Sequence, residues 1–276
     1  MKLNHEDIEK LDACDAIVSD LDGTLYLNNH AIPGAQEFLQ FINRSSKKLF
    51  YFTNNTSISR RSYLDKIAAL GFPSADEMLI TAADCADAYL KLKNLHPNIY
   101  LVGTKDLILE FEQRGYHCVS DAEAAGTTPQ AVILGFDTEL TYSKIQTCYD
   151  LITRDVPYIA THADILCPVT KNMFKPDIGS FIALFETATS GKRPVVVGKP
   201  SPYAVSAIGE RAKVPINKIA FIGDRLYTDI RMANNSGMTS VLVLSGETSR
   251  DMLLVSKDKP DIIIESIADL TTLLKR

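Results

Sequence analysis

The sequence predicts an α/β fold: a Rossmann-like, three-layer core with a mostly parallel sheet, and a second α/β domain inserted into it. Two patterns carry this prediction. Short apolar runs recur without alternating polar residues, as in strands that are buried on both faces of a parallel sheet. Helical stretches separate these runs, and strands that alternate with helices form parallel sheets through right-handed crossovers. The 276 residues suffice for one large domain or two small ones.

The expected strands are short and are bounded by polar or turn residues. Runs of this kind, rich in Val, Ile and Phe, suit the buried interior of a parallel sheet. Eight of them are found, over residues 16–18, 49–52, 99–102, 131–134, 195–197, 219–222, 241–244 and 262–264.

Helices are expected between several of these runs. Residues 36–43 follow a Pro-Gly pair that suits the entry of a helix. Residues 59–70 have apolar side chains spaced for one helical face, and Gly71 then provides a stop signal. Residues 202–213 show the same kind of pattern.

The middle of the chain has helices and strands of its own. Helices expected over residues 84–93 and 138–154 flank the apolar runs in this part, which indicates a second α/β unit inserted into the first. We therefore predict a core made of residues 1–80 and 179–276, and a cap made of residues 81–178.

Composition excludes several classes of protein. A content of 46% hydrophobic and 23% charged residues is typical of a globular chain and unlike collagen or disordered proteins. The net charge of −5, without a basic block, argues against nucleic acid as a partner. No apolar run approaches the roughly 20 residues of a membrane span, and the polar N-terminus shows no secretory signal. The five cysteines are far apart, which argues against a disulfide framework and favours a cytoplasmic location.

The strongest local signal is Asp20-Leu21-Asp22-Gly23-Thr24, just after the first apolar run. A strand end that relaxes into a glycine turn can aim both carboxylates at one cavity. Two close carboxylates repel each other unless a cation or a shared proton intervenes. Carboxylate oxygens suit Mg²⁺, although an isolated pair of this kind also fits an exposed, Asp-rich turn.

Polar groups follow three other apolar runs in the same way. They are Thr53-Asn54-Asn55, Gly198-Lys199-Pro200 and Gly223-Asp224-Arg225. Each alone also fits a helix cap, a turn or a solvated charge. The carboxyl ends of parallel strands lie at one edge of a sheet, where ligands bind. Together, these groups predict a crevice lined by acids, a Thr/Asn pair and a lysine.

In this order, the motifs resemble those of the haloacid dehalogenase superfamily. The resemblance rests on Asp20-x-Asp22-Gly23-Thr24, Thr53-Asn54-Asn55, Lys199, and Gly223-Asp224 followed by Asp229. The stretches Gly198-Lys199-Pro200-Ser201-Pro202 and Gly223-Asp224-Arg225-Leu226-Tyr227-Thr228-Asp229 look like the NagD-like subfamily. Its members insert a C2-type α/β cap between the second and third motifs and are mostly phosphomonoester phosphatases. The resemblance spans residues 16–244.

The resemblance implies an Mg²⁺-dependent phosphoric monoester hydrolase. Its substrate is a small phosphate ester, such as a sugar phosphate or a nucleotide monophosphate, and the reaction passes through an aspartyl-phosphate. Asp20 is then the nucleophile and Asp22 the general acid and base. The metal ligands are Asp20, the backbone carbonyl of Asp22, and Asp224. The phosphate oxygens are held by Thr53, Asn54, Gly23 and the catalytic Lys199.

Other residues are expected to support this set. Asp229 orients a metal-bound water or Lys199, and Thr24 and Asn55 lie behind the residues that contact ligands. In the cap, His162 and Asp164 are candidate substrate contacts, within Thr161-His162-Ala163-Asp164, where the family often has Thr-Asn-Pro-Asp. A histidine that only packs or hydrogen bonds locally is the other interpretation. The oligomeric state is open, with a homodimer through the cap as one form.

Two alternatives stay open at this point. The chain can be a catalytically silent protein that binds a phosphometabolite, or a phosphotransferase of the same superfamily. A dehalogenase is excluded, because dehalogenases of the superfamily normally lack an acid at the position of Asp22. A signalling receiver domain is disfavoured, because it has about half this length and pairs its acids side by side.

Overall fold

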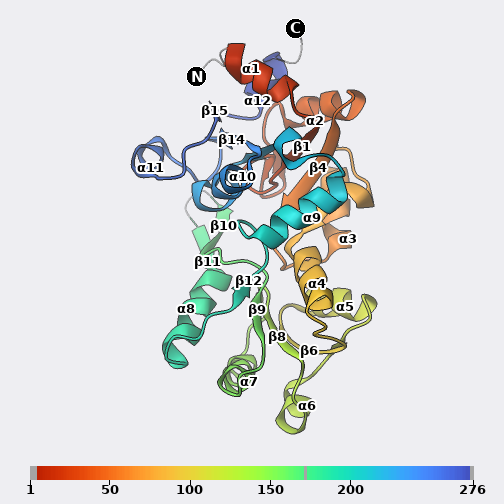
Figure 1. Ribbon diagram of the computed structural model, residues 1–276, viewed down its shortest axis with the longest axis vertical. Coiled ribbons are helices and arrows are strands. Elements are labelled where there is room, and N and C mark those ends of the chain that lie inside the picture. Colours follow the sequence, from red (N-terminus) through yellow and green to blue (C-terminus); the bar gives the residue numbers. More distant parts are fainter. Residues whose placement is uncertain (1–4, 171–172, 274–276) are drawn as a thin grey trace. The chain divides into compact units, whose positions relative to one another are not determined.

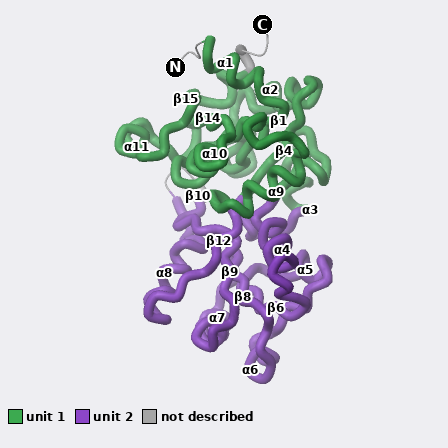
Figure 2. Tube along the Cα trace, in the orientation of Figure 1, with its two compact units in different colours: residues 1–53, 61–80, 199–276 green, residues 54–60, 81–198 purple. Residues whose placement is uncertain are grey.

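The computed structural model describes residues 5–170 and 173–273, and the chain divides into two compact units (Figure 2). Unit 1 comprises residues 1–53, 61–80 and 199–276, and unit 2 comprises residues 54–60 and 81–198. The predicted core contained residues 179–198, which the contacts place in unit 2, because Ile182 and Phe185 pack into its hydrophobic core. The division into a catalytic core and a cap with the predicted bounds stays a prediction.

Unit 1 contains a six-stranded sheet with the order β15-β14-β13-β1-β4-β5 (Figure 1). The central strand β1 (Ala16–Ser19) pairs in parallel with both neighbours, and its four residues are buried. A sheet of this kind is buried on both faces, which explains the apolar runs. The other strands are β4 (Lys48–Thr53), β5 (Leu79–Thr81), β13 (Ile219–Gly223), β14 (Thr239–Val243) and β15 (Ile262–Ile264), and β2 (Tyr26–Leu27) and β3 (His30–Ala31) form a separate antiparallel hairpin.

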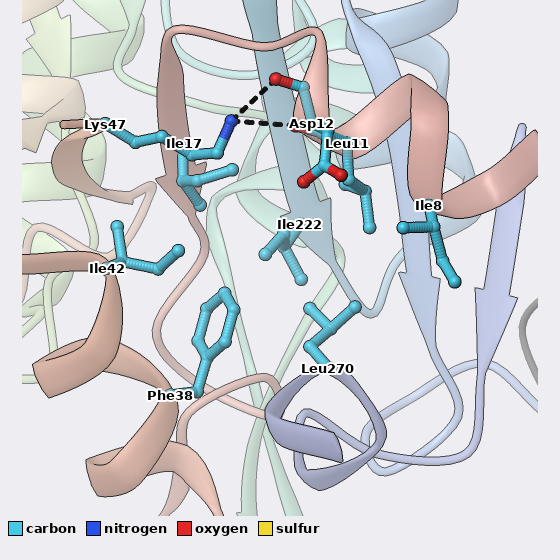
Figure 3. Close-up of a pocket in the computed structure, with 9 residues that line it drawn as sticks. All are labelled: Ile8, Leu11, Asp12, Ile17, Phe38, Ile42, Lys47, Ile222 and Leu270. Carbon is cyan, nitrogen blue, oxygen red and sulfur yellow. Dashed lines mark hydrogen bonds between the residues drawn. The ribbon is translucent and has the colours of Figure 1, made fainter. Parts of the chain in front are cut away.

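Three helices of unit 1 cover one face of this sheet. An apolar pocket between them is lined by residues of α1 (His5–Asp12), α2 (Ala35–Arg44) and α12 (Ala268–Leu273), with Ile17 and Ile222 of the sheet beneath (Figure 3). The remaining helices of the unit are α3 (Arg60–Ala69), whose first residue belongs to unit 2, α9 (Pro202–Ala212), α10 (Arg231–Ser236) and α11 (Arg250–Val255). Short helical turns are η1 (Asp76–Met78), η2 (Ile216–Lys218) and η3 (Leu226–Ile230).

Unit 2 has its own five-stranded sheet, with the order β12-β9-β8-β6-β7 and parallel pairing throughout. Its hydrophobic core joins this sheet to α7 (Tyr142–Thr153) and α8 (Ile178–Ala188). The strands are β6 (Asn98–Val102), β7 (His117–Cys118), β8 (Ala131–Leu134), β9 (Tyr158–Ala160) and β12 (Val195–Val196), besides the hairpin of β10 (Leu166–Thr170) and β11 (Met173–Pro176). The helices are α4 (Ala82–Leu92), α5 (Lys105–Gln113), α6 (Asp121–Gly126), α7 (Tyr142–Thr153) and α8 (Ile178–Ala188).

The predicted α/β class is confirmed, and each predicted strand and helix is present within a few residues of its expected bounds. One expectation about arrangement is wrong. The run 195–197 was expected among the strands that carry the site, but β12 pairs with β9 in the sheet of unit 2. An apolar run indicates a buried strand without showing which sheet it joins, and here the chain passes from unit 2 to unit 1 directly afterwards. Among the described residues, no helix has the length and apolar character needed to cross a membrane.

Candidate active site

The predicted site residues of unit 1 lie where the strand order reverses. Within the sheet, the chain proceeds from β1 to its neighbour β4, whereas β13 and β14 lie on the opposite side of β1. Such a reversal leaves a crevice at the carboxyl ends of the strands, where ligands bind in open α/β sheets. Asp20 follows β1, and its backbone N–H donates to the carbonyl of Ile222 at 2.8 Å. Thr53 ends β4, and Asp224 follows β13.

Lys199 binds two of the acids. Its Nζ lies 2.5 Å from Oδ1 of Asp20 and 2.8 Å from Oδ1 of Asp229. It also donates to the carbonyl of Phe52 at 3.3 Å. The lysine is only 2% exposed, so its charge is shielded from water and acts at short range on these carboxylates. The expected grouping of Asp20, Lys199 and Asp229 is therefore present in unit 1.

The electrostatics of this group favour a further cation. Burial raises the pKa of Asp20 well above its usual value, and it raises the pKa of Asp224 to about 7. Burial opposes the charge of Lys199, but Asp20 and Asp229 outweigh it and hold the pKa of Lys199 above its usual value. Three carboxylates and one ammonium carry a net charge of −2 when ionised. A bound cation relieves their mutual repulsion and stabilises the ionised carboxylates.

Three carboxylates are close enough to share one ion. Oxygen atoms of Asp20, Asp224 and Asp229 all lie within 4.8 Å of one another, and the three residues are buried. An all-oxygen donor set suits a hard divalent cation such as Mg²⁺. Asp20 and Asp229 each also bind Lys199 through Oδ1.

A loop after β14 positions Asp224, and this loop lies outside the predicted motifs. The backbone N–H of Glu247 donates to Oδ2 of Asp224 at 2.7 Å, and a Cβ at Gly246 would lie 2.0 Å from this oxygen. Gly23, with φ of +89°, also lies against Asp224, and a Cβ there would lie 2.4 Å from Oδ2. Thr24 donates its hydroxyl to Oδ1 at 3.5 Å. The signal for the loop was available, since Ser245-Gly246-Glu247-Thr248 also follows an apolar run.

Asp229 is held by a π-helical turn, η3. Its Oδ2 accepts the backbone N–H of Arg225 at 3.1 Å, while Oδ1 faces Lys199. Turns of this type widen the backbone and frequently occur at functional sites. Asp229 thus ties the segment after β13 to Lys199. Its orienting role stays a prediction.

Asp22 stands apart from the carboxylate group in its contacts. Its side chain is 37% exposed, and its Oδ2 accepts the hydroxyl of Tyr26 at 3.1 Å. The Nζ of Lys66 lies 4.0 Å from Oδ1. Burial raises the pKa of Asp22, and the charge of Lys66 and the hydrogen bond from Tyr26 oppose this effect. Neither Tyr26 nor Lys66 was expected at the site, because both lie outside the motifs.

The other predicted site residues lie in unit 2. The amide of Asn54, directly after Thr53, donates to Oδ1 of Asp164 at 3.3 Å. Asn55 accepts the N–H and the hydroxyl of Ser57, which closes a local turn. His162 is fully buried, and its Nδ1 accepts the N–H of Asp164 at 3.3 Å. In the neutral histidine, the proton is therefore on Nε2, which lies 3.8 Å from a carboxylate oxygen of Asp177. The roles predicted for these residues stay predictions.

Comparison with known proteins identifies the family. Residues 17–117 match the family model described as haloacid dehalogenase-like hydrolase, and residues 196–270 match one described as HAD-hydrolase-like. Chronophin from Homo sapiens is 32% identical over 271 residues, which cover 92% of this chain and 91% of that protein. The chain belongs to the haloacid dehalogenase-like hydrolases.

Solved structures of this hydrolase family agree along nearly the whole chain. The 4-nitrophenylphosphatase from Thermotoga maritima has a TM-score of 0.88 at 35% identity and covers 95% of this chain and 98% of its own. NagD from Escherichia coli K-12 has a TM-score of 0.81 at 27% identity, with 92% and 97% covered. A glycerol phosphate phosphatase from Mycobacterium tuberculosis, solved in complex with magnesium, has a TM-score of 0.82 at 28% identity, with 96% and 79% covered. The predicted NagD-like membership and the predicted enzyme class, a HAD-type phosphatase, are confirmed.

Proposed function

We propose that this hydrolase is an Mg²⁺-dependent phosphomonoesterase that acts on a small phosphometabolite through an aspartyl-phosphate on Asp20. The observation that carries the proposal is the buried contact of Asp20 with Lys199, beside Asp224 and Asp229, at the reversal of strand order. A nucleophile, a fixed positive charge and oxygen ligands for a metal thus come together in unit 1.

The carboxylates of Asp20 and Asp224 and the backbone carbonyl of Asp22 would hold the metal. When bound, Mg²⁺ neutralises charge between the anionic nucleophile and the phosphate. The magnesium complex of the glycerol phosphate phosphatase supports this choice of ion. The cluster itself supports it independently, since its all-oxygen donors carry excess negative charge.

In the first step, a carboxylate oxygen of Asp20 attacks phosphorus in line with the leaving oxygen. The bond from phosphorus to the ester oxygen breaks, and Asp22 transfers its proton to that oxygen, so that the product leaves as an alcohol. Thr53 and Lys199 hold the non-bridging oxygens and balance their charge. The buried contact with Asp229 keeps Lys199 directed at Asp20.

In the second step, water attacks phosphorus of the aspartyl-phosphate. Asp22, now ionised, takes a proton from this water, and the bond from phosphorus to the Asp20 oxygen breaks. Inorganic phosphate leaves and the carboxylate of Asp20 is restored. The same carboxyl group of Asp22 thus serves as acid and then as base.

Substrate choice belongs to the predicted cap. We also propose that Asn54 and the backbone of Gly23 bind the phosphate group. His162 and Asp164 remain the candidate specificity residues. The named relatives favour a small phosphate ester as substrate, and a panel of 4-nitrophenyl phosphate, glycerol phosphate, phosphoglycolate, sugar phosphates, pyridoxal phosphate and nucleotide monophosphates covers this class. A cytoplasmic location and a homodimer through the cap are part of the same proposal.

Removal of metal tests the proposal. We expect turnover of 4-nitrophenyl phosphate to be lost in excess chelator and restored by Mg²⁺, because the anionic nucleophile and the phosphate repel each other without a cation. Ca²⁺ should support turnover poorly, since its looser and larger coordination shell displaces the nucleophile from in-line attack.

Two variants control this experiment. Asp20→Asn should abolish turnover at every Mg²⁺ concentration, whereas Asp251→Asn, which removes an exposed carboxylate of α11, should leave the Mg²⁺ titration unchanged. Undiminished turnover in metal-free buffer would reject the metal site. Tight binding of the phosphate esters without any turnover would favour the silent binding protein.

A further inference from the structure

The surroundings of Asp22 differ from those of the other acids in unit 1. Asp20, Asp224 and Asp229 are buried against Lys199 or the backbone, whereas the side chain of Asp22 is 37% exposed and contacts two side chains outside the family motifs. These are Tyr26, on the hairpin strand β2, and Lys66, on α3.

The two oxygens of the Asp22 carboxyl group are distinct. Oδ2 accepts the phenolic hydroxyl of Tyr26 at 3.1 Å, and Oδ1 lies 4.0 Å from Nζ of Lys66. In a protonated carboxyl group, one oxygen carries the proton and the other accepts hydrogen bonds. A donor at Oδ2 therefore favours the state in which the exchangeable proton is on Oδ1.

Tyr26 is itself rigidly held. Its side chain is fully buried, its backbone N–H donates to the carbonyl of Leu21 at 3.3 Å, and its carbonyl accepts the N–H of Gly23 at 2.9 Å. The Nζ of Lys66 lies 3.9 Å from the centre of the Tyr26 ring, in the geometry of a cation–π contact. The phenol is thus fixed by backbone bonds on one side and by a lysine over its ring.

We propose that Tyr26 is a positioning residue for proton transfer: its hydroxyl holds the Asp22 carboxyl group through Oδ2, so that Oδ1 exchanges the proton with the leaving oxygen and then with water. The inference rests on the proposed function, because it requires Asp22 to be the general acid and base. Lys66 contributes by holding the phenol ring and by flanking Oδ1.

The test compares leaving groups. Tyr26→Phe removes the hydroxyl and keeps the ring, its packing and the cation–π contact. With glycerol phosphate, whose alcohol is a poor leaving group, we expect kcat to fall on the order of tenfold, since misplacing the acid forfeits part of its 10²–10⁴-fold contribution. With 4-nitrophenyl phosphate, which needs little protonation on departure, kcat should fall much less. KM for both esters and the Mg²⁺ titration should be unchanged.

Three further variants separate this effect from general damage. Tyr51→Phe removes another buried hydroxyl of unit 1, one that donates to the carbonyl of Pro73 at 2.8 Å, and should preserve the ratio of the two kcat values. Asp22→Asn should itself show a large, leaving-group-dependent loss. Adding Tyr26→Phe to Asp22→Asn should then cause no further change in the ratio, because the two residues act through one carboxyl group. Thermal melting of each variant shows that the fold is retained.

The outcomes distinguish a failure of the proposed function from a failure of the role of Tyr26. If the wild type hydrolyses neither ester, or if Asp22→Asn loses activity equally with both, the proposed function fails and the role of Tyr26 fails with it. If Asp22→Asn behaves as expected, the proposed function stands. Tyr26→Phe then overturns the inference by itself if it changes nothing, lowers kcat equally for both esters, or lowers the ratio equally in the Asp22→Asn background.

Discussion

At the residue scale, the position of Asp224 depends on two neighbouring residues that have no side chain. Glycines at positions 23 and 246 leave room for its carboxylate, and the backbone N–H of Glu247 fixes Oδ2. The short contacts reach beyond the tip of the side chain, since a Cβ at Gly246 would lie 2.6 Å from Cβ of Asp224. Rotation of the carboxylate alone therefore cannot make room for a side chain there.

We expect Gly246→Ala to weaken the metal site. Displacing Asp224 or the loop that holds it should raise the Mg²⁺ concentration for half-maximal activity by tenfold or more, which corresponds to about 1.4 kcal/mol. Gly126→Ala is the matched control, because a Cβ at that position meets no atom within 4 Å. A variant with a lower melting temperature and an unchanged Mg²⁺ titration would show that Gly246 matters for folding alone.

At this scale, the site residues that could be predicted from the sequence are those that belong to motifs. Asp20, Lys199 and Asp229 were expected together and are in contact. Tyr26 and Lys66 could not be expected, because a tyrosine after a glycine turn and a lysine on a helix have no signal that points to Asp22. Their contact depends on how the hairpin and α3 pack, which the local sequence does not specify.

At the element scale, helix α1 is held to unit 1 by one lysine. The Nζ of Lys47 donates to the carbonyls of Leu11 at 3.1 Å and Asp12 at 2.9 Å (Figure 3). It also donates to the carbonyl of Cys14 at 2.6 Å. Carbonyls at the carboxyl end of a helix lack partners within the helix and carry partial negative charge, so a cation stabilises them. Leu11 and Ile8 of the same helix line the apolar pocket above Ile17.

Lys47→Met should therefore loosen α1 without affecting the site. We expect the free energy of unfolding in urea to fall by about 1–3 kcal/mol, and the amides of α1 to exchange hydrogen faster. Lys257→Met, which removes an exposed lysine, should change neither quantity. If the amides of α1 exchange hydrogen equally slowly in Lys47→Met, apolar packing alone holds the helix.

The bounds of the strands were predicted more accurately than the strands with which they pair. Strands that are buried along their whole length, such as β1 and β8, were located to within a residue because burial on both faces leaves a clear apolar pattern. The sheet that a run joins is decided by packing between distant segments, and for this reason β12 was assigned to the wrong sheet. Lys199 still reaches Asp20, since it begins the segment that returns to unit 1.

At the scale of the whole molecule, two mostly parallel sheets form the centres of two units, and the chain crosses between the units several times. The carboxylates, the lysine and the residues around Asp22 all belong to unit 1, whereas Asn54, His162 and Asp164 belong to unit 2. The proposed catalytic residues and the candidate specificity residues are thus carried by different units. The class of reaction could be predicted from ordered motifs, but the substrate could not, because its contacts fall outside them.

The central claim, that Asp20 is the nucleophile, is tested most directly by trapping the phosphoenzyme. The Mg²⁺-loaded enzyme is mixed with 4-nitrophenyl phosphate, quenched in acid within milliseconds, digested and analysed by mass spectrometry. We expect the mass of one phosphoryl group on the peptide that contains Asp20, located at that residue by fragmentation, absent from Asp20→Asn and increased in Asp22→Asn, because dephosphorylation lacks its base. A phosphoryl group on Asp22, or full turnover by Asp20→Asn, would contradict the account.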